Sequence, residues 1–259
     1  MFDTAQGPIV PYDDDLRKAP SAFAPPLGTV IVGGQVLYFD GLGSTNDYAL
    51  RHGSDGTVVV AERQSAGRGR HGRTWHSAAG LGLWFSVVLE EGPHDDLVFA
   101  AVLAVRDAVR PGCRLDIKWP NDLLADGRKV CGVLVERRPR RAALGIGINV
   151  HHRLTDFPES LRGTAGSLEM VTGRVWSRGE VLRAVLRQLD RQVLLLRSGR
   201  GEAIRREWIE ACNLKGRQVR CGKLAGCVTD IDSLGALLLD TGHGTHRLVS
   251  GDVTVVTSP

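Results

Sequence analysis

Apolar residues in the central part of the chain alternate between the spacing of strands and the spacing of helices. Two short, nearly continuous apolar runs, at residues 58–61 and 83–89, are typical of buried β-strands. Over residues 97–109 the apolar positions recur at helical spacing, and the pair 111–112 (Pro-Gly) predicts the end of that helix. The order strand, strand, helix indicates a sheet with helices packed against it.

Two further helices are expected later in the chain. Ser177 and Glu180 have the spacing of a capping box, which predicts a helix start. An amphipathic pattern then continues through Val193, and a second helical pattern covers residues 202–211. The predicted fold class of the main part is therefore α+β, with a mixed β-sheet flanked by helices.

The chain changes character after about Lys215. Short β-rich runs are separated by turns that contain glycine and aspartate; they lie at residues 218–221, 226–232, 236–240, 247–249 and 253–256. Five short strands so close together favour a small β-barrel. We therefore predict a main domain at residues 29–212 and a small C-terminal domain at residues 213–259.

Residues 1–28 are predicted to be a tail or a loosely attached arm. Prolines at positions 8, 11, 20, 25 and 26 interrupt any periodicity. This stretch is too short for a helix-turn-helix domain, and it lacks the basic and apolar regions of a secretory signal. No run in the chain approaches the roughly 18 apolar residues of a membrane helix.

The charge and the cysteine content favour some classes of function over others. The net charge of +4 comes from arginines spread along the chain, and only 5% of residues are aromatic. Such a modest excess suits an acidic small molecule or an acidic partner better than nucleic acid. The five cysteines form no CxxC pair, which predicts reduced thiols in a cytoplasmic protein rather than a metal site.

The most unusual local sequence is the Arg–Gly segment, residues 61–75 (AERQSAGRGRHGRTW). Glycines 67, 69 and 72 have the GxGxxG spacing, but arginine and histidine between them fit a dinucleotide-binding turn poorly. Glycine-rich turns expose backbone N–H groups, and arginines add charged donors, so the segment suits a phosphate beside a carboxylate. A solvated basic turn or an RGG-like nucleic-acid segment is the alternative that spacing alone leaves open.

Four other segments carry polar residues at the ends of predicted elements. They are 43–46 (GSTN) before a helix, 118–122 (KWPND) and 128–136 (RKVCGVLVE) at strands, and 145–150 (GIGINV) in a glycine-containing strand. Ser44 offers an N-cap hydroxyl. Each segment by itself has an ordinary reading as a cap, a strand exit or a core strand.

Together and in this order, these segments resemble the bacterial biotin–protein ligases, across residues 38–257. The sequences DIDSLGALLLD (230–240) and SGDVTVV (250–256) resemble the SH3-like C-terminal domain of that family. The resemblance implies a catalytic domain that binds biotin and ATP, forms biotinyl-5′-AMP and transfers biotin to a carrier lysine. The short N-terminus resembles the monofunctional members, which lack the DNA-binding domain.

The resemblance also implies roles for individual residues. Biotin-binding residues would be Ser44, Thr45, Asn46, Gln64, Gly67, Arg68, Arg70, Lys129, Gly132 and Leu134. ATP- or adenylate-binding residues would be Arg70, Arg73, Trp75, Lys118 and Asn149. Lys129, Arg70 and Asp122 would be the catalytic residues, with Asp122 a candidate general base for the transfer step.

The implied cofactors are ATP and Mg²⁺, and no dedicated protein site for the metal is expected because Mg²⁺ keeps its waters and uses substrate phosphates. The implied partner is the biotin carboxyl carrier domain of an acetyl-CoA or related carboxylase. We expect no DNA or membrane partner, and a monomer or weak homodimer. Two alternatives are a lipoate- or octanoate-type protein ligase of related fold and a non-catalytic nucleic-acid-binding protein. We also expect residues 65–75 to be disordered or shifted without ligand, as loops that shield reactive intermediates are.

Overall fold

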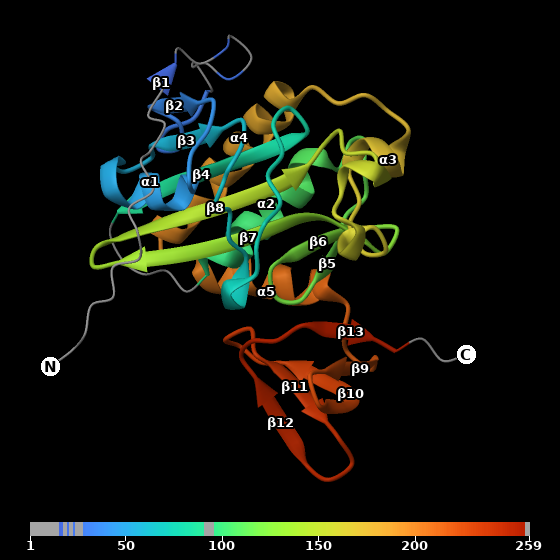
Figure 1. Ribbon diagram of the computed structural model, residues 1–259. Helices are drawn as coiled ribbons and strands as arrows, with labels where there is room; N and C mark the ends of the chain where they lie inside the picture. The colour runs from blue at the N-terminus through green and yellow to red at the C-terminus, as the bar shows by residue number, and fades with distance from the viewer. Residues whose placement is uncertain (1–15, 18–19, 21–22, 24–27, 91–95, 257–259) are drawn as a thin grey trace, which may run out of the picture.

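The structure is a computed structural model, which describes residues 16–17, 20, 23, 28–90 and 96–256. Its main part is an eight-stranded sheet in the order β1-β2-β3-β4-β8-β7-β6-β5 (Figure 1). The strands are β1 (Leu16–Arg17), β2 (Val36–Phe39), β3 (Val58–Ala61), β4 (Gly82–Glu90), β5 (Asp116–Lys118), β6 (Asp122–Ala125), β7 (Arg128–Arg138) and β8 (Arg141–Asn149). Strands β2 and β3 run parallel and the other neighbours antiparallel, which confirms the predicted mixed sheet.

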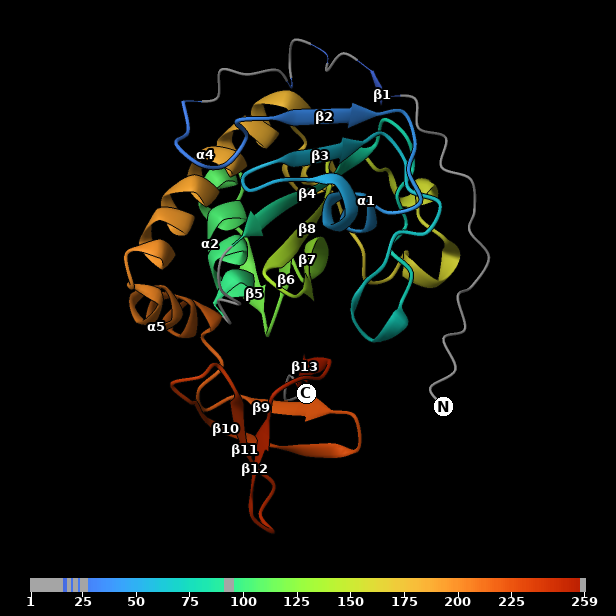
Figure 2. The same cartoon turned by 90° about the vertical axis from the view of Figure 1, so that its left-hand side faces the viewer.

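Helices cover the sheet unequally. Helices α2 (Leu97–Val109), α4 (Arg178–Arg197) and α5 (Gly201–Cys212) form the layer on one side, and α1 (Thr45–His52) lies on the other (Figure 2). The short helix α3 (Leu168–Thr172) follows β8. The alternation in β3 explains the two layers, because Val58 and Val60 enter the large core under α2 and α4 while Val59 joins a smaller cluster with Ala49 of α1.

The same alternation places three glycines on one face of β7 and β8. Val133 and Ile146 are paired across the two strands and are buried in the large core. Their neighbours Gly132, Gly145 and Gly147 therefore point to the opposite face, the side on which α1 lies. These three glycines line a cavity on that face, and we call their stretch of it the glycine-lined slot.

The C-terminal domain is a five-stranded antiparallel sheet in the order β12-β11-β10-β9-β13. Its strands are β9 (Gln218–Cys221), β10 (Leu224–Ile231), β11 (Leu237–Asp240), β12 (Thr245–Leu248) and β13 (Val253–Val255), within two residues of the predicted bounds. The domain is anchored to the main part by buried Trp119, whose indole N–H donates to the Gly235 carbonyl at 2.9 Å. Arg205 of α5 donates to the Ser233 carbonyl beside it.

Two described parts of the expected N-terminal arm contact the main domain. Strand β1 pairs with β2 at the sheet edge, and Phe23 is buried and stacks on Tyr38 with ring centroids 5.5 Å apart. The remaining residues of 1–28 lie outside the described part. In the part of the chain that the structure describes, no helix has the length and apolar character needed to cross a membrane.

Candidate active site

A single cavity of about 810 Å³ lies over the glycine face of the sheet and reaches the C-terminal domain. Of the fifteen residues implicated by sequence, all but Gly67 line it, namely Ser44, Thr45, Asn46, Gln64, Arg68, Arg70, Arg73, Trp75, Lys118, Asp122, Lys129, Gly132, Leu134 and Asn149. Leu134 and Lys129 lie five residues apart on β7, roughly 16 Å at strand rise. The cavity therefore has two separate ends.

The Arg–Gly segment folds back on itself to form one wall. The Trp75 amide donates to the Gly67 carbonyl at 2.8 Å, and the Gly69 amide donates to the Arg73 carbonyl at 2.7 Å. A Cβ at Gly67 would lie 2.7 Å from the Trp75 carbonyl oxygen, so the close return of the chain excludes any side chain there. Gly67 thus supports the site through backbone geometry although it does not line the cavity.

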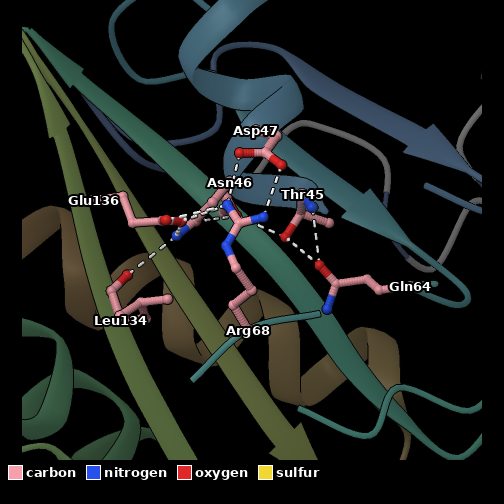
Figure 3. Close-up of polar contacts among 8 residues, drawn as sticks. Thr45, Asn46, Asp47, Gln64, Arg68, Leu134 and Glu136 are labelled. Carbon is pink, nitrogen blue, oxygen red and sulfur yellow. Dashed lines mark hydrogen bonds and ion pairs between the residues drawn. The ribbon is translucent and has the colours of Figure 1, made fainter. Parts of the chain in front are cut away.

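Neutral polar groups gather at the first end, which we call the amide end (Thr45, Asn46 and Gln64). The amide and hydroxyl of Thr45 both donate to Gln64 Oε1, at 2.9 and 3.1 Å (Figure 3). The Asn46 Oδ1 accepts from the Ser86 hydroxyl of β4 at 2.6 Å. Within the described chain, Ser44 is the N-cap residue of α1 but its side chain makes no capping hydrogen bond, contrary to expectation. This end offers donors and acceptors without a net charge of its own.

Basic groups gather at the other end, which we call the cationic end (Arg70, Arg73, Lys118 and Lys129). Lys129 Nζ lies 2.8 Å from Asp122 Oδ1 and 5.0 Å from the centre of a Trp75 ring. Arg70 donates to the neutral amide oxygen of Asn121 at 3.0 Å. Burial lowers the pKa of the Arg70 guanidinium, so an anion beside it would replace lost hydration.

The C-terminal domain contributes a carboxylate to this end. Asp252 accepts from Lys118 at 2.6 Å and from Arg73 at 3.1 Å. Burial would raise the pKa of Asp252, but the hydrogen bonds from Lys118 and Arg73 outweigh burial and hold the pKa below its ordinary value. Asp252 thus balances part of the positive charge at the cationic end.

Trp75 lies against the glycine-containing strands β7 and β8, and Asn149 is the last residue of β8. A Cβ at Gly147 would lie 2.5 Å from the Trp75 indole, and one at Gly132 would lie 2.8 Å from it, so both glycines are needed for the ring to rest on the sheet. Asn149 Nδ2 donates to the Gly166 carbonyl at 2.9 Å, which fixes the amide at the cavity wall.

Comparison with known proteins agrees with this geometry. The sequence profile of the biotin/lipoate A/B protein ligase family matches residues 39–152. The bifunctional ligase/repressor BirA of Bacillus subtilis is 33% identical over 247 residues, which cover 88% of this chain and 76% of the relative. A biotin–[acetyl-CoA-carboxylase] ligase of Mycobacterium tuberculosis is 33% identical over 237 residues, covering 82% of this chain and 85% of the relative. The chain belongs to the biotin protein ligase family.

A solved member of the biotin protein ligase family has the same architecture. The biotin protein ligase from Aquifex aeolicus, in complex with biotin and ATP, superposes with a TM-score of 0.76 and 30% identity, covering 87% of this chain and 100% of that one. The mixed sheet with its small C-terminal β domain is therefore the fold of this family.

Several cavity residues of this family member escaped the sequence analysis. They are Asn121, Phe157, Leu161, Thr164, Ala165 and Asp252 among others. Asn121 lies inside the KWPND motif and could have been included from its neighbours alone. Asp252 lies inside the segment 250–256, but its place at the cavity depends on how the two domains pack. The Phe157–Ala165 loop carries no local signal, because its place depends on how loops pack.

Proposed function

We propose that this chain is an ATP-dependent biotin–protein ligase, which forms biotinyl-5′-AMP and transfers biotin to a specific lysine of a biotin carboxyl carrier domain. One observation carries the proposal: a single cavity joins a neutral amide end to a cationic end across a glycine-lined slot. An uncharged ureido ring suits the amide end, and the valeryl chain suits the slot. The carboxylate then lies among Arg70 and Lys129, where an α-phosphate would also be held.

In the first step, a carboxylate oxygen of biotin forms a bond to the α-phosphorus of ATP and the bond to pyrophosphate breaks. Negative charge grows on the non-bridging oxygens, and fixed cations stabilise it where it develops. Lys129 suits this role because Asp122 holds its ammonium at 2.8 Å. Arg70 suits it because its present partner, Asn121, is neutral and can be exchanged for an anion at little electrostatic cost.

Trp75 and Asn149 are the proposed adenine contacts. The Trp75 Nε1 is buried and has no hydrogen-bond partner among the described residues, so a ligand acceptor could satisfy it. The apolar residues Phe157 and Leu161 border the same cavity and offer packing surface for a flat base. These contacts would place the α-phosphate toward the cationic end.

In the second step, the carrier lysine attacks the acyl carbon, AMP leaves, and the amine loses a proton. Asp122 is the proposed proton acceptor, since it lines the cavity beside Lys129. Mg²⁺ would enter with the ATP phosphates and neutralise the pyrophosphate leaving group. The ion is proposed to keep part of its water shell and to be held by the substrate phosphates.

The proposed setting is cytoplasmic, supported by five cysteines that are all free thiols. The carrier domain of an acetyl-CoA or related carboxylase is the proposed partner, with the ligase a monomer or weak homodimer that binds no DNA. The test is to incubate the chain with biotin, ATP, Mg²⁺ and a purified carrier domain and to weigh the carrier. A carrier mass increased by one biotinyl group supports the proposal, and an unmodified carrier contradicts it.

The family profile also covers lipoate ligases, so substrate choice needs its own measurement. ATP–pyrophosphate exchange should be stimulated by biotin and not by lipoate or octanoate. Stimulation by lipoate alone would instead identify the lipoate-type ligase.

A further inference from the structure

Arg68 of the Arg–Gly segment makes different contacts from Arg70 of the same segment. Arg68 donates from Nη1 and Nη2 to both carboxylate oxygens of Asp47, at 2.8 and 2.6 Å, and Nη2 also lies 3.1 Å from Glu136 Oε1 (Figure 3). Arg70, by contrast, has a neutral amide as its hydrogen-bond acceptor. The Arg68 guanidinium is therefore committed to protein carboxylates, whereas Arg70 is positioned to accept an anion.

The two partners of Arg68 come from distant parts of the fold. Asp47 lies in the first turn of α1, and Glu136 lies near the end of β7. The forked contact with Asp47 is the geometry in which an arginine–carboxylate pair gains both strength and direction. Hydrogen bonding to Asp47 raises the pKa of Arg68, and the contact with Arg68 lowers the pKa of Asp47, so both groups stay charged. One guanidinium thus clamps the Arg–Gly segment to α1 and β7.

The clamp also reaches the amide end of the cavity. Glu136 Oε2 accepts from Asn46 Nδ2 at 2.7 Å, while Asn46 Oδ1 accepts from the Ser86 hydroxyl. These two contacts decide which way the Asn46 amide faces. Asp47 follows Asn46 directly in α1, and Glu136 accepts a hydrogen bond from the Asn46 side chain. By contacting Asp47 and Glu136, Arg68 therefore holds two neighbours of the Asn46 amide group in place (Figure 3).

We propose that Arg68 is a positioning residue for the acid substrate: its clamp on Asp47 and Glu136 aligns the amide end with the Arg–Gly segment. This inference rests on the proposed function for the identity of the acid, biotin. It assigns Arg68 to recognition of the neutral ring end and removes it from anion binding.

The test uses two variants that loosen the clamp from opposite sides. Arg68→Lys keeps the charge but loses the fork, and Asp47→Asn removes the partner without altering the Arg–Gly segment. Each should raise KM for biotin in pyrophosphate exchange by about tenfold, as expected for a forked charge-assisted contact, with KM for ATP within about twofold. Arg73→Lys is the matched comparison from the same segment, and it should change KM for ATP without changing KM for biotin.

A double-mutant cycle identifies the clamp as one unit. Arg68→Lys combined with Asp47→Asn should raise KM for biotin no further than either change alone. Additive effects, an equal rise of both KM values, or an unchanged KM for biotin in Asp47→Asn would overturn the proposal. If Arg68→Lys does not fold, Asp47→Asn carries the test alone.

A measurement without substrate separates this inference from the proposed function. Amide hydrogen exchange of residues 65–75 should become several-fold faster in both clamp variants, because the segment has lost its side-chain anchor. Unchanged exchange would refute the clamp even in an active biotin ligase. If the wild-type chain shows no biotin-dependent exchange of pyrophosphate but the clamp variants show the faster hydrogen exchange, the proposed function fails while the clamp itself stands.

Discussion

Gly147→Ala tests the idea that the site depends on glycine where Trp75 rests on β8. The added Cβ would lie 2.5 Å from the Cε2 and Nε1 atoms of Trp75, where an ordinary contact begins at 3.4 Å. The indole must therefore withdraw by roughly 1 Å. Overpacking of this kind costs on the order of 1–3 kcal/mol when the neighbours cannot move.

Trp75 belongs to the Arg–Gly segment rather than to the sheet, so most of this cost should fall on ligand binding and not on folding. We expect KM for ATP in pyrophosphate exchange to rise by about tenfold, which corresponds to about 1.4 kcal/mol. The melting temperature should fall by only a few degrees. Gly34→Ala is the control, because a Cβ there would meet no atom within 4 Å. An unchanged KM for ATP in Gly147→Ala would show that adenine recognition does not need Trp75 against the strand.

Three further predictions concern other parts of the site. Lys129→Ala should abolish adenylate formation, measured as biotin-dependent pyrophosphate exchange. The melting temperature should be nearly unchanged, because Lys129 is partly exposed at the start of β7. Exchange at the wild-type rate would contradict this prediction. Tryptic cleavage within residues 65–75 should slow when biotin and ATP are present, and equal cleavage would argue against closure of the segment. Burial lowers the pKa of His152 from 6.5 to about 4, because the buried ring is held neutral. Its contribution to the free energy of unfolding, about 3 kcal/mol, is therefore fully present above about pH 6.5 and is lost as the pH falls toward 4. Denaturant unfolding of His152→Phe should show a flatter pH dependence across that window than the wild type, and identical curves would contradict the assignment.

Local patterns in the sequence were sufficient for most elements. The buried runs at 58–61 and 83–89 and the helical spacing at 97–109 correspond to β3, β4 and α2. The expected cap of the fourth helix is also present, since the Ser177 side chain accepts from the Glu180 amide. These features depend on residues within one or two turns of each other, which is why a pattern can reveal them.

Contacts between residues far apart in the sequence could not be predicted from local patterns. Arg68 could be placed in a binding segment from its neighbours, but its two carboxylate partners lie 21 and 68 positions away. Asp252 and Lys118 are separated by 134 positions and belong to different domains. Their pairing depends on how the C-terminal domain docks, and the hydrogen bond from Trp119 to Gly235 is one contact of that docking.

The glycines of the slot could be predicted from the sequence only in part. Gly145 and Gly147 are two residues apart in a predicted strand, so period-two alternation already places both on one face. That Gly132 lies opposite Gly147 requires the register of β7 against β8, which no local pattern contains. Once the register is known, the three glycines are seen to share one face, which explains why Trp75 and Asn46 can approach the sheet so closely. Each strand sequence therefore predicts which of its own residues share a face, but only the pairing of β7 with β8 brings the glycines of both strands together.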